Sequence, residues 1–103
     1  MDDLLKHEYY NQLFDCYEKL LTTKQQEYFK MYYFLDYSLG EIASSFELSR
    51  NAVFDALSKT TKLLTEYEEK LHLLANKKAR WLIIEKLEKE YSKELLEELK
   101  KID

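Results

Sequence analysis

The stretch YSLGEIASSFELSRNAVFDAL, residues 37–57, has the pattern of a short helix, a tight turn and a second helix. Ser38 and Glu41 have the spacing of a capping box, in which each side chain accepts a hydrogen bond from the other residue's backbone N–H. Ser49 is a favoured N-cap for a second helix that begins at Arg50. We therefore predict a helix-turn-helix unit in the middle of the chain.

Apolar residues in this stretch predict how its two helices pack. Ile42 and Ala43 are expected to face the second helix, and the small side chain of Ala43 lets the two backbones approach closely. Val53 and Leu57 recur at helical spacing and are expected to anchor the second helix in the core.

The turn between the two helices lacks the glycine that is usual in such motifs. Glu47 stands at that position, so a non-glycine residue must adopt the left-handed conformation. Leu48 is expected to be the apolar plug beneath the turn. Gly40 lies inside the first helix, where it lowers helix propensity by about 1 kcal/mol relative to alanine. Gly40 either allows another group to approach closely or has no role there.

The outward face of the second helix is predicted to bind DNA, because the N-terminal part of this helix enters the major groove in helix-turn-helix proteins. Arg50 can bind guanine, Asn51 can bind adenine, and the Phe54 ring can contact a thymine methyl. Lys59 and Lys62 are expected to contact phosphates. The candidate DNA-binding residues are Ser49, Arg50, Asn51, Phe54, Asp55, Ser58, Lys59 and Lys62.

Two alternatives for these residues stay open. Arg50 and Asn51 can be ordinary solvated residues of a first helical turn. Phe54 can pack on the helix predicted between Thr22 and Leu35 instead of facing a ligand.

Helical periodicity extends in both directions from this unit. Apolar residues at three- and four-residue steps predict a helix over about 3–21. Thr22 and Gln25 have capping-box spacing and predict a helix that starts there and carries an apolar stripe to Leu35. The helix that begins at Arg50 is expected to continue to a break at Asn76, because asparagine tolerates the left-handed conformation.

Two further helices are expected after this break, the second of them capped by Ser92. The predicted fold is therefore one all-α domain over residues 1–103. Its helix-turn-helix core spans about 22–73, with a long recognition helix, and its C-terminal helices span about 77–103. Tyrosines on the helical stripes are predicted to be core residues with a hydroxyl at the surface: Tyr10, Tyr17, Tyr28, Tyr32 and Tyr67.

The composition excludes several kinds of site. Gly40 is the only glycine, so phosphate-binding loops that need two or more glycines cannot form. Cys16 is the only cysteine, which excludes an intramolecular disulfide and a cysteine-cluster zinc site. His7 and His72 lie far apart, without the carboxylate spacing of a metal site. Since no nucleophile, histidine and acid form a catalytic arrangement, we expect no enzymatic activity, no cofactor and no metal.

The chain contains no apolar run of 18 residues, and its N-terminus is acidic and unlike a secretory signal. We therefore expect a cytoplasmic protein with no membrane span.

The net charge of −4 is unevenly distributed along the chain. Residues 1–48 carry −5, residues 49–80 carry +3 and residues 81–103 carry −2. The positive segment holds the predicted recognition helix but allows only about four to six phosphate contacts per chain. We expect a homodimer, which doubles those contacts. A surface for the second copy is offered by the C-terminal stripe of Leu95, Leu96, Leu99 and Ile102. The acidic flanks leave open that a protein partner binds instead.

Residues 20–57, LLTTKQQEYFKMYYFLDYSLGEIASSFELSRNAVFDAL, and 65–73, TEYEEKLHL, are similar to the YlxM-like family of small bacterial helix-turn-helix proteins. Within them, residues 37–57 resemble sigma-factor region 4. The resemblance extends into the charged, leucine-rich tail and covers nearly the whole chain. Two departures are Gly40, where a larger residue is more usual, and a tail that ends soon after Ile102.

The resemblance implies an all-helical, sigma-region-4-like fold of the winged-helix-like superfamily and a regulatory, DNA-binding role. It also implies a link to the signal recognition particle pathway. The alternative function is then a protein-binding module that modulates the particle's GTPase or RNA without specific DNA binding.

Overall fold

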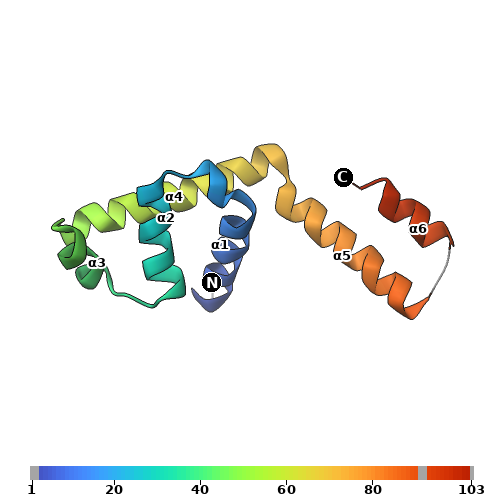
Figure 1. Ribbon diagram of the computed structural model, residues 1–103, viewed down its shortest axis with the longest axis horizontal. Coiled ribbons are helices and arrows are strands. Elements are labelled where there is room, and N and C mark those ends of the chain that lie inside the picture. The colour runs from blue at the N-terminus through green and yellow to red at the C-terminus, as the bar shows by residue number, and fades with distance from the viewer. Residues whose placement is uncertain (1–2, 91–92, 103) are drawn as a thin grey trace.

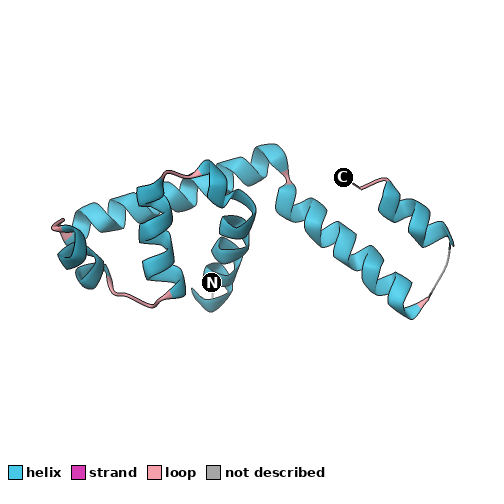
Figure 2. Cartoon of the chain, viewed as in Figure 1, coloured by secondary structure: helices cyan, strands magenta, loops and turns pink. Residues whose placement is uncertain are grey.

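A computed structural model describes residues 3–90 and 93–102, and its regular structure in those ranges is entirely helical (Figure 2). The expectation of an all-α fold is confirmed. In chain order the elements are α1 (Asp3–Tyr17), the 3-10 turn η1 (Glu18–Leu20), α2 (Thr23–Phe29), the π-helical turn η2 (Lys30–Phe34), α3 (Leu39–Phe46), α4 (Arg50–Leu71), α5 (Leu73–Lys89) and α6 (Lys93–Lys100).

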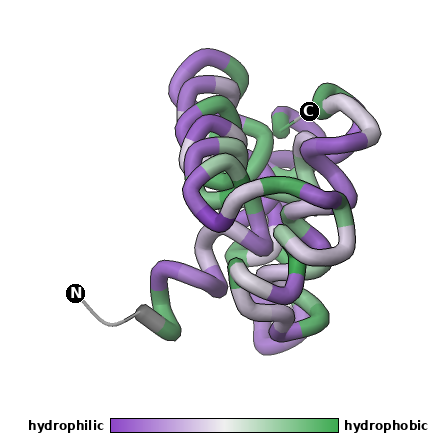
Figure 3. The backbone as a smooth tube through the Cα atoms, turned by 90° about the vertical axis from the view of Figure 1, so that its left-hand side faces the viewer, coloured by the Kyte–Doolittle hydropathy of each residue, from purple (hydrophilic) through white to green (hydrophobic). Residues whose placement is uncertain are grey.

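The long helix α4 organises the other helices (Figure 1). α1 and α2 pack against it, α3 packs near its start, and α5 extends beyond its end. α6 folds back along α5, so this pair projects from the rest of a molecule whose extents are 57 × 23 × 23 Å. Hydrophobic and hydrophilic segments alternate along the helical tube, as expected for helices that bury one face (Figure 3).

One buried cluster holds the helix-turn-helix unit together. Ile42 and Ala43 of α3 pack with Val53 and Leu57 of α4, and Tyr28 of α2 completes the cluster. The predicted packing of these two helices is therefore confirmed. Because this cluster fixes the inner face of α4, it also fixes which side chains point outward.

A second cluster joins α1 to α2, to the C-terminal half of α4 and to the start of α5. Its buried residues are Leu13, Phe14, Tyr17, Leu21, Phe29, Leu64 and Leu74. Phe14 and Phe29 stack in parallel with ring centroids 4.3 Å apart, and Phe34 meets both rings edgewise. Of the tyrosines predicted to lie in the core, Tyr17 and Tyr28 are buried, whereas Tyr10, Tyr32 and Tyr67 are half-buried.

The first α-helix ends earlier than the periodicity predicts, whereas the second continues from α2 into the π-helical turn η2 and ends close to the predicted Leu35. The α-helix expected over 3–21 stops at Tyr17 and tightens into η1. The side-chain amide of Gln26 donates to the carbonyls of Glu18 and Leu21, at 2.8 and 3.2 Å, and thereby holds the loop that follows. The predicted capping box at the start of α2 is confirmed, with Thr22 and Gln25 bonded reciprocally at 3.2 and 2.9 Å.

The break after α4 lies at His72, so the prediction of a break at Asn76 is wrong. His72 adopts the left-handed conformation with φ 55°, and Asn76 lies inside α5. The proposed cap of the last helix, Ser92, lies outside the described residues.

A tertiary cap explains why the chain turns at His72. The Glu68 carboxylate accepts hydrogen bonds from the Tyr17 hydroxyl at 2.6 Å and from the N–H groups of Leu74 and Ala75 at 3.0 and 3.1 Å. The Tyr17 hydroxyl in turn accepts the N–H of Leu73 at 3.0 Å. The side chains of Glu68, near the end of α4, and of Tyr17, on the distant helix α1, thus satisfy the first free N–H groups of α5, in place of an N-cap from His72.

Two pKa shifts accompany this tertiary cap. Burial and the hydrogen bond to Glu68 raise the pKa of Tyr17 to about 12, so the hydroxyl stays protonated and keeps donating at neutral pH. Desolvation by burial raises the pKa of Glu68, but the hydrogen bonds from Tyr17 and the α5 backbone outweigh it and the net shift is downward. Both shifts favour the bonded arrangement near neutral pH.

Candidate nucleic-acid interface

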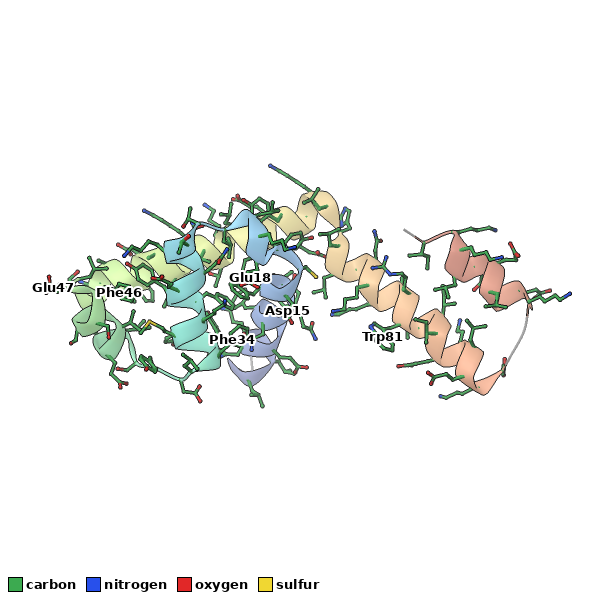
Figure 4. The ribbon with its side chains drawn as sticks, viewed as in Figure 1. Asp15, Glu18, Phe34, Phe46, Glu47 and Trp81 are labelled. Carbon is green, nitrogen blue, oxygen red and sulfur yellow. The ribbon has the colours of Figure 1, made fainter. Side chains whose placement is uncertain are left out.

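The turn between α3 and α4 is built without glycine, as the sequence predicts. Glu47 adopts the left-handed conformation with φ 55° and ψ 42° (Figure 4). The N–H of Leu48 donates to the carbonyl of Ala43 at 2.9 Å, which closes the end of α3. Ser49 accepts the N–H of Ala52 at 3.0 Å and caps α4, so the predicted N-cap is confirmed.

Phe46, rather than Leu48, is the apolar residue that packs at this turn. Leu48 is 42% exposed, so the prediction that it forms the plug is wrong. The Phe46 ring meets the Tyr28 ring edgewise with centroids 4.8 Å apart, and Lys24 Nζ lies 4.8 Å from the centroid of the Phe46 ring. Because α3 extends to Phe46, its last turn directs that ring at α2, and Leu48 follows the left-handed residue on the outer side.

A capping box fixes the other end of α3. The hydroxyl of Ser38 accepts the N–H of Glu41, and the Glu41 carboxylate accepts the N–H of Ser38, both at 3.0 Å. These hydrogen bonds lower the pKa of Glu41. The capping box predicted from the sequence is therefore confirmed, and α3 is held at both ends.

The structure exposes every predicted DNA-binding side chain. Ser49, Arg50, Asn51, Phe54, Asp55, Ser58, Lys59 and Lys62 are all exposed, whereas Val53, Leu57 and Thr60 of α4 are buried. Most of the eight lie away from this buried stripe, but Arg50 has helical spacing to Val53 and Leu57 and is exposed because it stands in the first turn of α4.

These side chains divide among different sides of α4. Asn51, Asp55 and Lys62 lie opposite the buried stripe, at helical spacing along the middle of the exposed face. Lys59 lies on the flank next to the start of α2, where it lines a shallow groove with Lys24. Phe54 and Ser58 lie on the other flank and line a cleft toward α1.

Lys24 joins this surface although sequence reasoning did not select it. It belongs to the first turn of α2 and reaches the exposed flank of α4 because α2 packs against that helix. Its place in the Thr22–Gln25 capping box indicates a helix start, but not which helix lies beside it. Only the tertiary arrangement brings Lys24 to Lys59.

The cations of this surface have no acidic partner within the described chain. The two ion pairs found among residues 3–90 and 93–102 are Lys30–Glu18 at 3.0 Å and Lys100–Glu97 at 3.6 Å. Lys24, Arg50, Lys59 and Lys62 take part in neither. They are therefore available to an external anion, with Asp55 as the one acid among the predicted residues.

Other kinds of site lack support in the described part of the chain. No group of three or more His, Cys, Asp or Glu side chains could hold a metal ion there. No helix within it is both long enough and apolar enough to cross a membrane.

Comparison with known proteins agrees with this architecture. Residues 4–102 match the model of the UPF0122 family, described as "Putative helix-turn-helix protein, YlxM / p13 like". The UPF0122 protein YofM of Lactococcus lactis is 47% identical over 98 residues, which cover 90% of this chain and 88% of the relative. A UPF0122 protein of Listeria innocua is 45% identical over 102 residues, covering 90% of this chain and 93% of the relative.

A UPF0122 protein of Oceanobacillus iheyensis is 52% identical over 77 residues, which cover 75% of this chain and 73% of the relative. The family model spans residues 4–102, and with them the helix-turn-helix unit and the C-terminal helices α5 and α6. The similarity to the YlxM-like family noted from residues 20–57 and 65–73 is thereby confirmed, and this chain belongs to the UPF0122 family of helix-turn-helix proteins.

Proposed function

We propose that this protein is a cytoplasmic, regulatory DNA-binding protein whose α4 binds the major groove in the manner of sigma-factor region 4. The observation that carries the proposal is the exposed first half of α4, where Arg50, Lys59 and Lys62 have no ion-pair partner within the described chain. Lys24 adds a fourth cation beside Lys59. The role is one of binding, and no catalytic step is assigned to these residues.

Each residue of the surface has a distinct part in this proposal. Arg50 and Asn51, in the first turn of α4, contact base edges, and the exposed ring of Phe54 contacts a thymine methyl. Lys59 and Lys62 contact phosphates and position the helix. Free N–H groups near Ser49 at the start of α4 are suited to one further phosphate.

Selection from random DNA at two salt concentrations tests this function. We expect one motif to be enriched, and we expect Arg50→Ala to weaken binding to it by about 1–3 kcal/mol, mainly at one base position. Lys59→Ala is expected to weaken binding to all DNA sequences alike. It is also expected to lower the slope of log binding constant against log salt concentration by about 1. Lys70→Ala is the matched control, because Lys70 is exposed near the acidic end of α4. Binding that survives Arg50→Ala without any salt dependence refutes the proposal.

A second copy of the chain strengthens such binding, and we propose that the α5–α6 pair provides the dimer contact. Trp81 and Leu82 are adjacent on the projecting helix α5 and are 54% and 60% exposed (Figure 4). Four cations per chain bind DNA weakly, whereas a symmetric pair can bind two half-sites. Sedimentation of the wild type and of Leu82→Glu tests this. A wild type that sediments as a monomer at all concentrations refutes the dimer.

A second candidate function is a protein-binding module that modulates the signal recognition particle. Its support is the acidic content of the exposed side of α4, where Asp55, Glu66 and Glu69 interrupt the cations. The particle's GTPase and RNA would be mixed with this protein, and complex formation and GTP turnover measured. No complex and no change in turnover would exclude this function, whereas enrichment of a DNA motif would favour the first.

A further inference from the structure

A cleft of about 380 Å³ lies between α1, η2 and α4, and most of its lining residues have no part in the DNA-binding proposal. Its walls include Lys6, His7 and Tyr10 of α1, Tyr32 and Tyr33 of η2, and Phe54 of α4. This volume lies within the range of about 300–1,000 Å³ that is typical of small-molecule sites.

The walls of the cleft are rings held in fixed relative orientations. Tyr33 stacks on the buried Phe29 with centroids 4.4 Å apart, so the core supports it from behind. Tyr32 meets Tyr33 edgewise at 5.0 Å, and His7 meets Tyr33 edgewise at 4.7 Å. Rings at such angles offer both faces and edges to a bound planar molecule.

The π-helical turn η2 accounts for this concentration of rings. The N–H of Leu35 bonds to the carbonyl of Lys30 at 3.0 Å, five residues back. The wider turn brings the consecutive residues Tyr32 and Tyr33 to the same cleft. Turns of this kind are rare and occur frequently at functional sites.

The polar groups of the cleft favour an anion. Lys6 lies with Nζ 5.9 Å from the centroid of Tyr10 and takes part in neither ion pair of the described residues. None of the described side chains that line the cleft is acidic, although the chain as a whole carries −4.

Hydroxyl donors complete the polar set. Burial, with smaller contributions from Tyr10 and Tyr32, raises the pKa of Tyr33 to about 12, so this hydroxyl remains a donor at neutral pH. Ser58 adds a hydroxyl on the α4 side of the cleft. A charged group and neutral donors thus lie beside the aromatic walls.

We propose that this cleft binds a small planar aromatic molecule that carries an anionic group. The rings of Tyr32, Tyr33 and Phe54 contact the planar part, and Lys6 binds the anionic group. The cleft shares Phe54 and Ser58 with the proposed DNA-binding surface, but its test uses no nucleic acid, so failure of one proposal is distinguishable from failure of the other.

Naphthalene-2-carboxylate, naphthalene-2-carboxamide and cyclohexanecarboxylate separate the requirements for charge and for planarity. Each is titrated into the ¹⁵N-labelled full-length protein while backbone amide resonances are recorded. We expect the naphthoate to shift the resonances of Lys6, His7, Tyr32, Tyr33 and Ser58 with saturation. The amide is expected to bind about fivefold more weakly, because it lacks the contact with a solvated lysine. Cyclohexanecarboxylate lacks a planar ring and is expected to bind more weakly still.

Variants assign these contacts to residues. Lys6→Gln is expected to weaken the naphthoate to the level of the amide and to leave the amide unchanged. Phe54→Ala is expected to weaken both aromatic probes alike. Leu71→Ala is the matched control, because it also removes an exposed apolar side chain from α4 but lies at the far end of that helix.

Two results overturn the proposal. One is equal binding of naphthoate and amide to the wild type, which removes the role of Lys6. The other is a map of shifts centred on Trp81 and Leu82 instead of the cleft, which shows adsorption to an exposed apolar surface.

Discussion

Replacing Glu68 by alanine is expected to destabilise the fold far more than replacing its neighbour Glu69. Glu68 accepts three hydrogen bonds at the α4–α5 junction, from Tyr17, Leu74 and Ala75. Glu69 is exposed and accepts no hydrogen bond from the described residues. The two variants delete the same charge from adjacent positions of one helix, so their difference measures the junction itself.

The magnitude follows from the groups that lose their acceptor. Two N–H groups in the first turn of α5 lose their cap, and loss of an N-cap costs about 1 kcal/mol. The hydroxyl of Tyr17, a residue that is only 1% exposed, loses its acceptor, and a buried donor left unpaired costs about 1–3 kcal/mol. The sum is about 2–4 kcal/mol for Glu68→Ala. Glu69→Ala is expected to change stability by less than about 0.5 kcal/mol.

Urea unfolding followed by circular dichroism at 222 nm measures both variants at pH 7. A double-mutant cycle with Tyr17→Phe isolates the 2.6 Å hydrogen bond between Tyr17 and Glu68. We expect a coupling energy of about 1–2 kcal/mol for that pair. Equal stability losses in Glu68→Ala and Glu69→Ala refute the assignment of the junction to the Glu68 carboxylate.

The pH dependence supplies an independent check of the same group. The pKa of Glu68 is lower in the folded protein than in the unfolded chain, so its stabilisation is complete above the unfolded value. That stabilisation is lost as the pH falls through the folded pKa. The difference in stability between wild type and Glu68→Ala is therefore expected to shrink below about pH 4. A difference that stays constant down to pH 2 contradicts the lowered pKa.

Three further predictions concern the helix-turn-helix unit and are measured by the same unfolding assay. Gly40→Ala is expected to stabilise the protein by about 0.4–1 kcal/mol, since an added Cβ meets its nearest atom at 3.9 Å; destabilisation would reveal a close approach that the structure does not contain. Ser49→Ala is expected to cost about 1 kcal/mol, because the N–H of Ala52 loses its acceptor, and Ser49→Asp should retain most of that stability. Leu48→Ala is expected to lower the free energy of unfolding by less than about 1 kcal/mol, whereas Leu64→Ala, at a fully buried residue, is expected to lower it by about 2–5 kcal/mol. Similar losses in the two variants would show that Leu48 packs beneath the turn after all.

The starts of α2, α3 and α4 could be predicted because their signals are local. Thr22, Ser38 and Ser49 each cap a helix three residues or fewer from their partner, and all three caps are present. The end of α4 could not be predicted, because its determinants are distant. Glu68 and Tyr17 are 51 positions apart in sequence and become partners only when α1 packs on α4. Signals within the local sequence therefore indicate a helix end at Asn76, although the helix ends at His72.

In the candidate site, too, the residues placed by the helical period could be predicted, and those placed by tertiary packing could not. The exposed face of α4 follows from its own period, so Asn51, Asp55 and Lys62 could be placed on one surface from the sequence, with Lys59 on its flank. Lys24 could not, because its approach to Lys59 depends on how α2 packs. The cleft lined by Phe54 could not be predicted either. The apolar pattern of residues 28–35 does not distinguish a π-helical turn from an ordinary α-helix.

The distribution of charge along α4 limits how far a nucleic acid can follow it. Arg50, Lys59 and Lys62 lie in residues 50–62, which span about 20 Å at 1.5 Å per residue. Beyond them Glu66 and Glu69 are exposed and repel a phosphate backbone, while the Glu68 carboxylate is engaged at the junction with α5. A length of about 20 Å suits one passage through a major groove about 12 Å wide. The long helix thus combines a first part that carries Arg50, Lys59 and Lys62 with an acidic end that fixes the direction of α5, and the overall charge of −4 is an average over such unlike segments.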